Sequence, residues 1–547
     1  MCFYRTRGVE KTMASERSLV RGGVLIAVSL AFLTASAYAQ DWPDVFGPTL
    51  LMTLNIQMDP CDLNTILDLV ERDIDDFETE YPAWFWANGE ENEKIWVAVR
   101  RKSGDPIDAN DHTKISFKID INEYHIDDPC DPCFPGHPDS VEMWHGLKKL
   151  SLENGDDNNV LKEGIAANMH QMASCAAGYG HDAWRANWVE LYVNGTYYGV
   201  YVNAEQLDKT FMINRGFYVY HETWLYQYRG NHSFTLEVGD DLNPKSPAVD
   251  ELCYFPFAHG NPVSDLYPSG DICSAPSGSE LETQLNDLIN MQSMLTMAAV
   301  NIFTSNPDSL FTHSRNSHFL DFNLDNPSET RKRMYLPWDV DASLQSTSFN
   351  IYSPGDEYAD IIFGNPTFKA QYDQILIDLL TGPLSEANIH AFINSIEPVL
   401  TDAVAADAGN QLDTPGVAGV AEEFDSIRNW FSDRIANVFS QLNYTPDIDG
   451  DSIEDSNDNC PYTANTNQND SDGDGIGNAC DNCDGPCTCS AANLDSLNPV
   501  NHADLSFITE YWMLAGADLP GDVDGSESVN LDDLEIVAAF WLETCSP

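Results

Sequence analysis

Acidic and amide side chains gather in the second half of the chain, in a spacing that phosphoryl transfer could use. Asp308 follows an apolar helical stretch and a Ser-Asn-Pro turn, and Asn316 precedes a predicted strand. Asp339 and Asp341 stand in Pro-Trp-Asp-Val-Asp, at the end of another short apolar strand. One carboxylate could position an attacking hydroxyl, while an amide and a second carboxylate hold magnesium on the phosphates. Acidic residues after strands more commonly cap helices or form turns, so the spacing alone leaves both interpretations open.

A different chemistry is indicated near the C-terminal end, where aspartates alternate with small residues and glycine. Alternate carboxylates in a tight turn converge on one hard cation. Calcium suits this arrangement better than magnesium, because it accepts about six to eight flexible oxygen ligands. The alternative is a disordered acidic linker. The candidate calcium ligands in two such segments are Asp447, Asp449, Asp451, Asp455, Asp470, Asp472, Asp474 and Asp481.

A further acidic segment has the spacing of an EF-hand-like loop, with oxygen side chains at loop positions 1, 3, 5, 9 and 12. An upstream half-repeat shares the frame, but it departs from the pattern because Leu497 stands at its fifth position, where an oxygen ligand is expected. Only the downstream loop is therefore predicted to hold calcium. Its candidate ligands are Asp522, Asp524, Ser526, Asn530 and Asp533.

The charge of the chain agrees with cation binding. The formal net charge is −60, and no Lys or Arg follows Arg434. Such an acidic segment repels itself and nucleic acid alike unless cations neutralise it. The composition therefore argues against a nucleic-acid partner.

The N-terminal residues predict export. Several arginines precede an apolar run that ends in Ala37-Tyr38-Ala39, a small-x-small cleavage pattern. The run is shorter than the about 20 residues that span a bilayer, so a signal peptide over 1–39 is favoured over an uncleaved anchor. No later stretch predicts a membrane span, which indicates a secreted or cell-surface protein. Of 13 cysteines, Cys2 lies in the leader, and the even remainder predicts disulfides, including a local one in Cys130-Asp-Pro-Cys133.

The elements that must position these residues predict an α+β fold. Period-two alternation favours strands in the first half, and Asn194-Gly195 predicts a hairpin turn between two of them. The predicted strands are 94–100, 114–122, 147–152 and the two arms of 188–202. Helical patterns follow at 160–173, 280–304, 368–380, 386–406 and 422–442.

Four segments, 146–160, 193–211, 306–316 and 336–341, resemble the spore-coat CotH family of atypical protein kinases. The family has a reduced kinase fold and uses ATP with a divalent metal, magnesium or manganese, to phosphorylate serines of secreted or coat proteins. The resemblance implies that Asp308 is the catalytic-loop aspartate and that Asp339 binds the metal. It places Asn316 and Asp341 with them as cofactor-binding candidates.

The resemblance also implies a phosphate-binding lysine, with Glu205 as its partner. The family usually has Leu-Tyr-Lys at that point, where this chain reads Leu-Tyr-Gln with Gln227. Arg229, two residues on, could substitute, because it faces the same side of the predicted strand. The chain is therefore either a kinase with a relocated cation or a binding-only relative. Other basic residues that could contact phosphates are Arg100, Arg101, Lys102, Lys148 and Lys149.

The tail resembles a thrombospondin type 3 repeat followed by a dockerin-like domain. The first resemblance implies a Cys460–Cys480 disulfide, and the second suggests that Cys487 or Cys489 pairs with Cys545. A dockerin would bind a cohesin-like partner; the alternative is a calcium-stabilised cap. The expected domains are the signal peptide 1–39, the CotH kinase-like domain 45–440, the calcium-binding repeat 445–485 and the dockerin-like domain 490–547.

Two functions follow from these expectations. The first is a secreted kinase that transfers phosphate from ATP to serines of an extracellular protein. The second is an inactive structural or adhesion protein that is attached through its calcium-dependent C-terminal modules.

Overall fold

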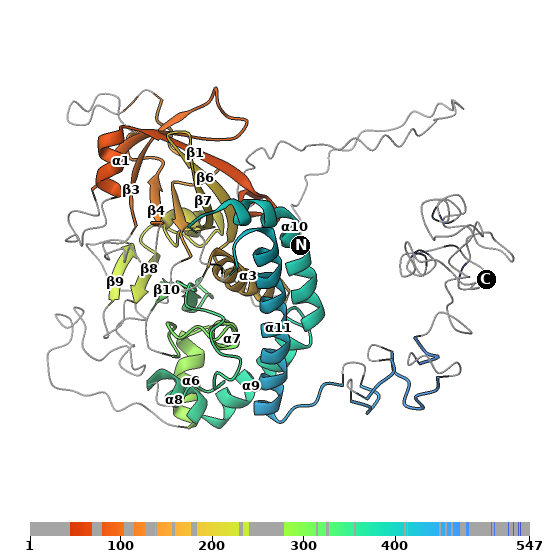
Figure 1. Cartoon of the computed structure of the whole chain (residues 1–547). Helices are drawn as coiled ribbons and strands as arrows, with labels where there is room; N and C mark the ends of the chain where they lie inside the picture. The colour runs from red at the N-terminus through yellow and green to blue at the C-terminus, as the bar shows by residue number, and fades with distance from the viewer. Residues whose placement is uncertain are drawn as a thin grey trace, which may run out of the picture. The chain divides into compact units, whose positions relative to one another are not determined.

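The computed structural model divides the chain into two compact units, Met1–Gln441 and Leu442–Pro547, which are described separately. The first unit contains almost all of the helices and strands discussed below (Figure 1). The structure describes residues 44–67, 79–102, 114–125, 137, 139–155, 159–176, 183–228, 234–239, 278–312, 316–323, 326, 328–354, 357–409, 412, 414–447, 450–454, 457–460, 463–470, 477–480, 505, 508, 523, 529, 534 and 537.

A closed barrel forms the N-terminal part of the first unit. Strand order around the barrel is β1-β2-β3-β4-β5-β7-β6, with β1 parallel to β6 and the other pairs antiparallel. Alternate side chains point inward, as in β1, so that Leu54 and Ile56 are fully buried. The strands are β1 (Met52–Met58), β2 (Tyr81–Ala87), β3 (Ile95–Arg101), β4 (Phe117–Asp120), β5 (Lys149–Glu153), β6 (Ala186–Val193) and β7 (Thr196–Ala204).

The hairpin predicted at Asn194-Gly195 joins β6 and β7. Both residues have positive φ, 50° and 77°, as the tight turn between twisted strands requires. The Asn194 carboxamide also accepts a hydrogen bond from the backbone N–H of Met58, 2.9 Å away. The turn thereby helps to close the barrel at β1.

A four-stranded sheet follows, in the order β11-β10-β8-β9. Its strands are β8 (Thr223–Tyr228), β9 (Phe234–Val238), β10 (Ser317–Phe322) and β11 (Met334–Pro337). Every residue of β10 and β11 is buried, and Arg333 neutralises the buried Asp321 through two hydrogen bonds of 2.6 and 2.7 Å. This sheet carries Asn316 and Asp339 at the ends of two adjacent strands.

Helices form most of the rest of the first unit. Asn365 and Ser385 cap two of them with their side chains, and hydrogen bonds from Arg428 link the two longest, α10 and α11 (Figure 1). The helices are η1 (Asp44–Phe46), α1 (Pro60–Ile66), α3 (Val160–Ala176), α4 (Lys209–Asn214), α6 (Ser279–Leu288), α7 (Met291–Phe303), α8 (Glu357–Gly364), α9 (Pro366–Leu380), α10 (Glu386–Ala406) and α11 (Gly416–Leu442).

The single helix predicted over 280–304 is wrong: two helices, α6 and α7, occupy this segment. Ile289 is extended (φ −117°, ψ 142°) and forms a β-bridge with Arg333. Asn290 then caps α7, because its side-chain oxygen accepts a hydrogen bond from the Ser293 N–H. The apolar pattern continues through both helices, so periodicity did not reveal the break.

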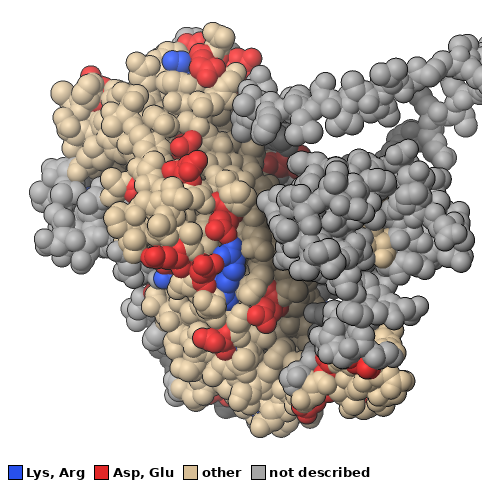
Figure 2. Space-filling model, turned by 45° about the vertical axis from the view of Figure 1, so that its right-hand side comes forward, with Lys and Arg blue, Asp and Glu red and all other residues tan. Residues whose placement is uncertain are grey.

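The mixture of helices and strands agrees with the predicted α+β class, with strands concentrated before α6 and helices after it. Acidic side chains are spread over the face in Figure 2, and basic ones gather in small groups beside them. Within the described ranges, no helix has the length and apolar character that a membrane crossing needs.

Candidate functional site

The loop after α7 brings three of the predicted site residues together. The Asn306 side chain accepts a hydrogen bond from the Asp308 N–H (3.0 Å) and donates one to the Asp339 carbonyl (3.1 Å). The Asn316 amide donates to the Asp339 carboxylate (3.1 Å). Asn316 and Asp339 both have positive φ, 48° and 61°, a conformation that Asn and Asp adopt more readily than other non-glycine residues.

Asp339 lies among other charged groups. Burial raises the pKa of its carboxyl group above the ordinary value, and the carboxylates of Glu153 and Asp308 raise it further. Lys102 and a hydrogen bond with Asp341 oppose this increase. Asp341 itself accepts a hydrogen bond from the Ala342 N–H (2.7 Å). The structure therefore places all four acidic and amide candidates, Asp308, Asn316, Asp339 and Asp341, in one region.

The cation at this site is Lys102, which directly follows β3. Its Nζ lies 2.5 Å from Oε2 of Glu153 on β5, and the Ser151 hydroxyl donates to the other oxygen of Glu153 (2.6 Å). Burial lowers the pKa of Lys102, but the attraction of Glu153 and Asp339 outweighs burial and raises the pKa above its ordinary value. Lys102 is therefore protonated at neutral pH.

Glu163 on α3 supplies another buried carboxylate. Its Oε2 is buried without a hydrogen-bond partner. Burial raises the pKa of Glu163 well above the ordinary value, and Glu153 and Asp341 raise it further. Helix α3 packs closely against the barrel because Gly164 has no side chain: a Cβ there would lie 2.4 Å from the Trp188 ring. Trp188 also donates its indole N–H to the Val160 carbonyl of α3 (2.7 Å).

A small cavity of about 20 Å³ lies between these groups. As it stands, the cavity has no room for a nucleotide, so a ligand of that size would have to displace side chains. The indole of Trp338 is 5.9 Å from Lys102 Nζ and 6.3 Å from the ring of Trp184. The cavity is lined by Lys102, Glu153, Glu163, Ala167, Trp184, Val202, Ala204, Trp338, Asp339 and Val340.

The remaining predicted kinase residues lie elsewhere. Arg215 donates to both oxygens of Glu205 (2.8 and 2.7 Å), so Glu205 is a partner of this arginine. Gln227 lies in β8 opposite His318 and does not line the cavity. Arg229 falls outside the described residues.

Sequence reasoning missed the pairing at the centre of the site. Lys102 was one of five basic candidates, and Glu153 and Glu163 were not singled out. The local signals were a lysine immediately after a strand and a glutamate in the first turn of a helix. They did not suffice, because β3 and β5 are about 50 residues apart in the chain and come close only by pairing with the two sides of β4.

The site has features that suit a divalent cation. Glu163 is buried and Asp339 is half-buried, both have raised pKa values, and one oxygen of Glu163 is unsatisfied. Oxygen ligands of this kind match magnesium or manganese. In the part of the chain that the structure describes, however, no three His, Cys, Asp or Glu side chains are close enough to form a metal site.

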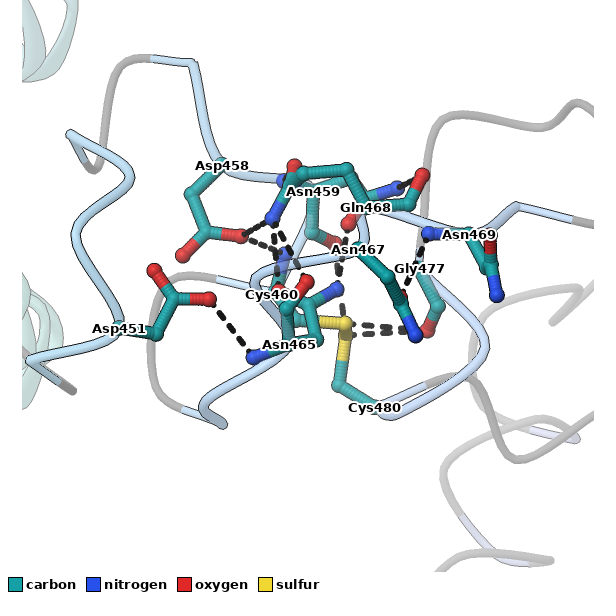
Figure 3. Close-up of a disulfide and its surroundings, with 10 residues drawn as sticks. All are labelled: Asp451, Asp458, Asn459, Cys460, Asn465, Asn467, Gln468, Asn469, Gly477 and Cys480. Carbon is teal, nitrogen blue, oxygen red and sulfur yellow. Dashed lines mark hydrogen bonds between the residues drawn. A yellow bond between two sulfur atoms is a disulfide. The ribbon is translucent and has the colours of Figure 1, made fainter.

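The second unit contains a compact turn built around the Cys460–Cys480 disulfide (Figure 3). Asp447 accepts hydrogen bonds from the N–H groups of Gly450 and Ser452, and Asp451 accepts from those of Ile453 and Asn465. These contacts orient the two carboxylates. The predicted disulfide pairing is confirmed.

Oδ1 of Asp458, which was not predicted as a ligand, accepts hydrogen bonds from the Cys460 N–H and the Gln468 amide. Its Oδ2 is buried and has no hydrogen-bond partner. Cys61, in the first unit, is an exposed free thiol, contrary to the expectation that the cysteines pair.

Most predicted calcium ligands cannot be compared with the structure. Asp470 ends the described segment 463–470. The predictions at Asp449, Asp455, Asp472, Asp474, Asp481, Asp522, Asp524, Ser526, Asn530 and Asp533 fall outside the described residues, as do Cys130, Cys133, Cys487, Cys489 and Cys545.

Comparison with known proteins agrees with two of the resemblances. The family described as CotH kinase protein matches residues 103–438, and the thrombospondin type 3 repeat matches residues 446–468. No curated protein shows significant similarity to the chain. The repeat suggests an extracellular protein. With its match covering more than half of the sequence and including Asp308, Asn316 and Asp339, the chain belongs to the CotH kinase protein family.

Proposed function

We propose that the first unit is an ATP-dependent protein serine kinase in which Lys102 supplies the cation that Gln227 cannot. The observation that carries this proposal is the position of Lys102 beside Asp339, in a cavity that also contains Glu153 and Glu163. A site with the aspartates but without a basic side chain would leave the metal ion as the one group that neutralises the phosphates of ATP. Lys102 removes that objection to the kinase hypothesis.

Each residue then has a defined task. Asp308 would accept the proton of the serine hydroxyl, and its position is fixed by Asn306. Asp339 and Asn316, which are hydrogen-bonded to each other, would hold magnesium or manganese with Glu163. The metal would neutralise charge on the phosphates. Lys102 would exchange Glu153 for a phosphate oxygen, which requires that the 2.5 Å contact with Glu153 opens.

The test is transfer of radiolabelled phosphate from ATP to protein by wild type, Lys102→Met and Gln227→Ala. We expect Lys102→Met to lower the rate by about 100-fold or more, because one charged contact to the transferring group is lost. Gln227→Ala should stay within about twofold of wild type.

Lys149→Met is the matched control. Lys149 is another barrel lysine, paired with Asp120 (2.9 Å), and it does not line the cavity. A wild-type rate in Lys102→Met, together with a loss of rate in Gln227→Ala, would contradict the assignment of the phosphate contact to Lys102 and place it on β8.

For the second unit we propose calcium binding and attachment. The oriented carboxylates of Asp447 and Asp451, together with the unsatisfied oxygen of Asp458, support a cation in the repeat. The dockerin-like segment would bind a cohesin-like partner outside the cell. Calcium-dependent retention of the full chain on immobilised cohesin would support this attachment, and equal retention in calcium and in EDTA would contradict it.

A further inference from the structure

A second cavity in the first unit lies away from the candidate active site. Its volume is about 470 Å³. None of the residues around Lys102 or Asp339 lines it. We call it the basic cavity, because its lining contains two cations and no carboxylate: Phe217, Asn286, Ile289, Asn290, Met291, Gln292, Thr330, Arg331, Lys332, Met334 and Gln371.

The two cations are held in different ways. Arg331 donates from Nε and Nη2 to Glu329 (2.8 and 2.7 Å) and lies over the Phe322 ring. Its Nη1 has only a long contact, 3.4 Å, with the Gly216 carbonyl. The guanidinium is therefore fixed in place with one edge still able to donate.

Lys332 carries the uncompensated charge. Its Nζ donates to the Asn286 carbonyl, and among the described residues no carboxylate forms an ion pair with it. An ammonium group has three donors, so two remain for a ligand. Around it stand the amides of Asn290, Gln292 and Gln371. In a chain of net charge −60, a cavity with this lining would attract an anion.

Two elements, α7 and β11, connect the basic cavity to the candidate active site. The Asn290 N–H donates to the Arg333 carbonyl (2.9 Å), which joins the start of α7 to the start of β11. From there α7 leads to Asp308 and β11 leads to Asp339. Since α7 has 13 residues, it is roughly 20 Å long. An extended peptide of about six or seven residues has the same length.

We propose that the basic cavity binds the phosphoserine of a peptide that the kinase has already phosphorylated, so that a second serine can reach Asp308. This inference rests on the proposed function. Arginine and lysine together suit a dianionic phosphate, and the amides add neutral donors.

The test measures binding of a short peptide with one phosphoserine to the full-length chain, without ATP or divalent metal. The unphosphorylated peptide and inorganic phosphate serve as comparison ligands. We expect the phosphopeptide to bind at least about tenfold more tightly than either. Arg331→Gln and Lys332→Gln should each weaken its binding by about tenfold, and Arg331→Lys should weaken it less.

Arg428→Gln is the matched control, because Arg428 is also paired with acidic residues, Glu397 and Asp425, but does not line the cavity. It should bind the phosphopeptide as wild type does. Thermal unfolding of each variant establishes that it is folded. Equal binding of both peptides, or unchanged binding in folded Arg331→Gln and Lys332→Gln, would overturn the proposal.

Inorganic phosphate that binds as tightly as the phosphopeptide would assign the cavity to the free ion and overturn the peptide assignment. Asp339→Asn separates this inference from the proposed function. It should abolish phosphate transfer but leave phosphopeptide binding intact, so that either hypothesis can fail alone.

Discussion

At the residue scale, the site concentrates negative charge around one lysine. Glu153, Glu163 and Asp339 line a single small cavity, and among its described lining residues Lys102 is the one cation. Burial and mutual repulsion raise the pKa values of Glu163 and Asp339, which means that their ionised forms destabilise the folded protein. A bound cation would offset this cost, so the site gives up stability in favour of binding.

Glu163→Gln should therefore stabilise the protein while weakening metal-dependent nucleotide binding. The folded protein binds the Glu163 proton more tightly than the unfolded chain does, so the contribution of Glu163 to stability falls as pH rises above about 4.5. Removing the charge should raise the free energy of unfolding by about 1–2 kcal/mol at pH 8 and by less at pH 5. Denaturant titrations at the two pH values, without divalent metal, measure this difference. A variant that is less stable than wild type at both pH values would contradict it.

At the element scale, α7 positions the catalytic loop, and its C-terminal end is fixed by one arginine. Arg434 of α11 is fully buried and donates to the carbonyls of Phe303 (3.0 Å) and Ile302 (2.8 Å). It also donates to the carbonyls of Thr347 and Phe349. These bonds satisfy helix-end acceptors only a few residues before Asp308.

Arg434→Met should lower the free energy of unfolding by about 3 kcal/mol, because it removes the donor to four carbonyls, of which only those of Ile302 and Phe349 keep another donor among the described residues. We also expect slower phosphate transfer at temperatures where the variant is still folded, since the loop of Asp308 loses its support. Arg428→Met, at a partly exposed position of the same helix away from the α7 end, is the control. Stability unchanged within about 0.5 kcal/mol would show that Arg434 does not hold the loop.

The sequence predicted the elements that depend on local patterns and missed the contacts between distant segments. Alternation identified β3 to β7, and a two-residue signal placed the hairpin at Asn194-Gly195, because both patterns are local. The division between α6 and α7 was missed, since it depends on a bridge from Ile289 to Arg333 on a distant strand. The pairing of Lys102 with Glu153 was missed for the same reason, whereas Asp308, Asn316 and Asp339 were found from motifs that lie close together in the chain.

At the scale of the whole molecule, the first unit has a large core, whereas the described residues of the second unit include few buried apolar side chains. The described part of the second unit is held by turns and by the Cys460–Cys480 disulfide. Its aspartates have no Lys or Arg after Arg434 to neutralise them. On the proposed calcium binding, we expect cations to supply much of the stability of this unit, whereas the first unit should not depend on calcium.

Removal of calcium should accordingly affect the two units differently. In EDTA, limited proteolysis of the full chain should cleave the 442–547 unit rapidly and leave a stable fragment close to residues 45–441. Added calcium should restore protection, and magnesium at the same concentration should not. Equal protection of the second unit in EDTA and in calcium would contradict the proposed calcium sites.

The measurement that tests the central claim most directly is isothermal titration of the full-length chain with ATP, with and without manganese. The Lys102 assignment predicts metal-dependent binding that is lost in Asp339→Ala and in Lys102→Met but is retained in Lys149→Met and Gln227→Ala. No binding at millimolar ATP by the folded wild-type chain, or equal binding by wild type and Lys102→Met, would contradict it.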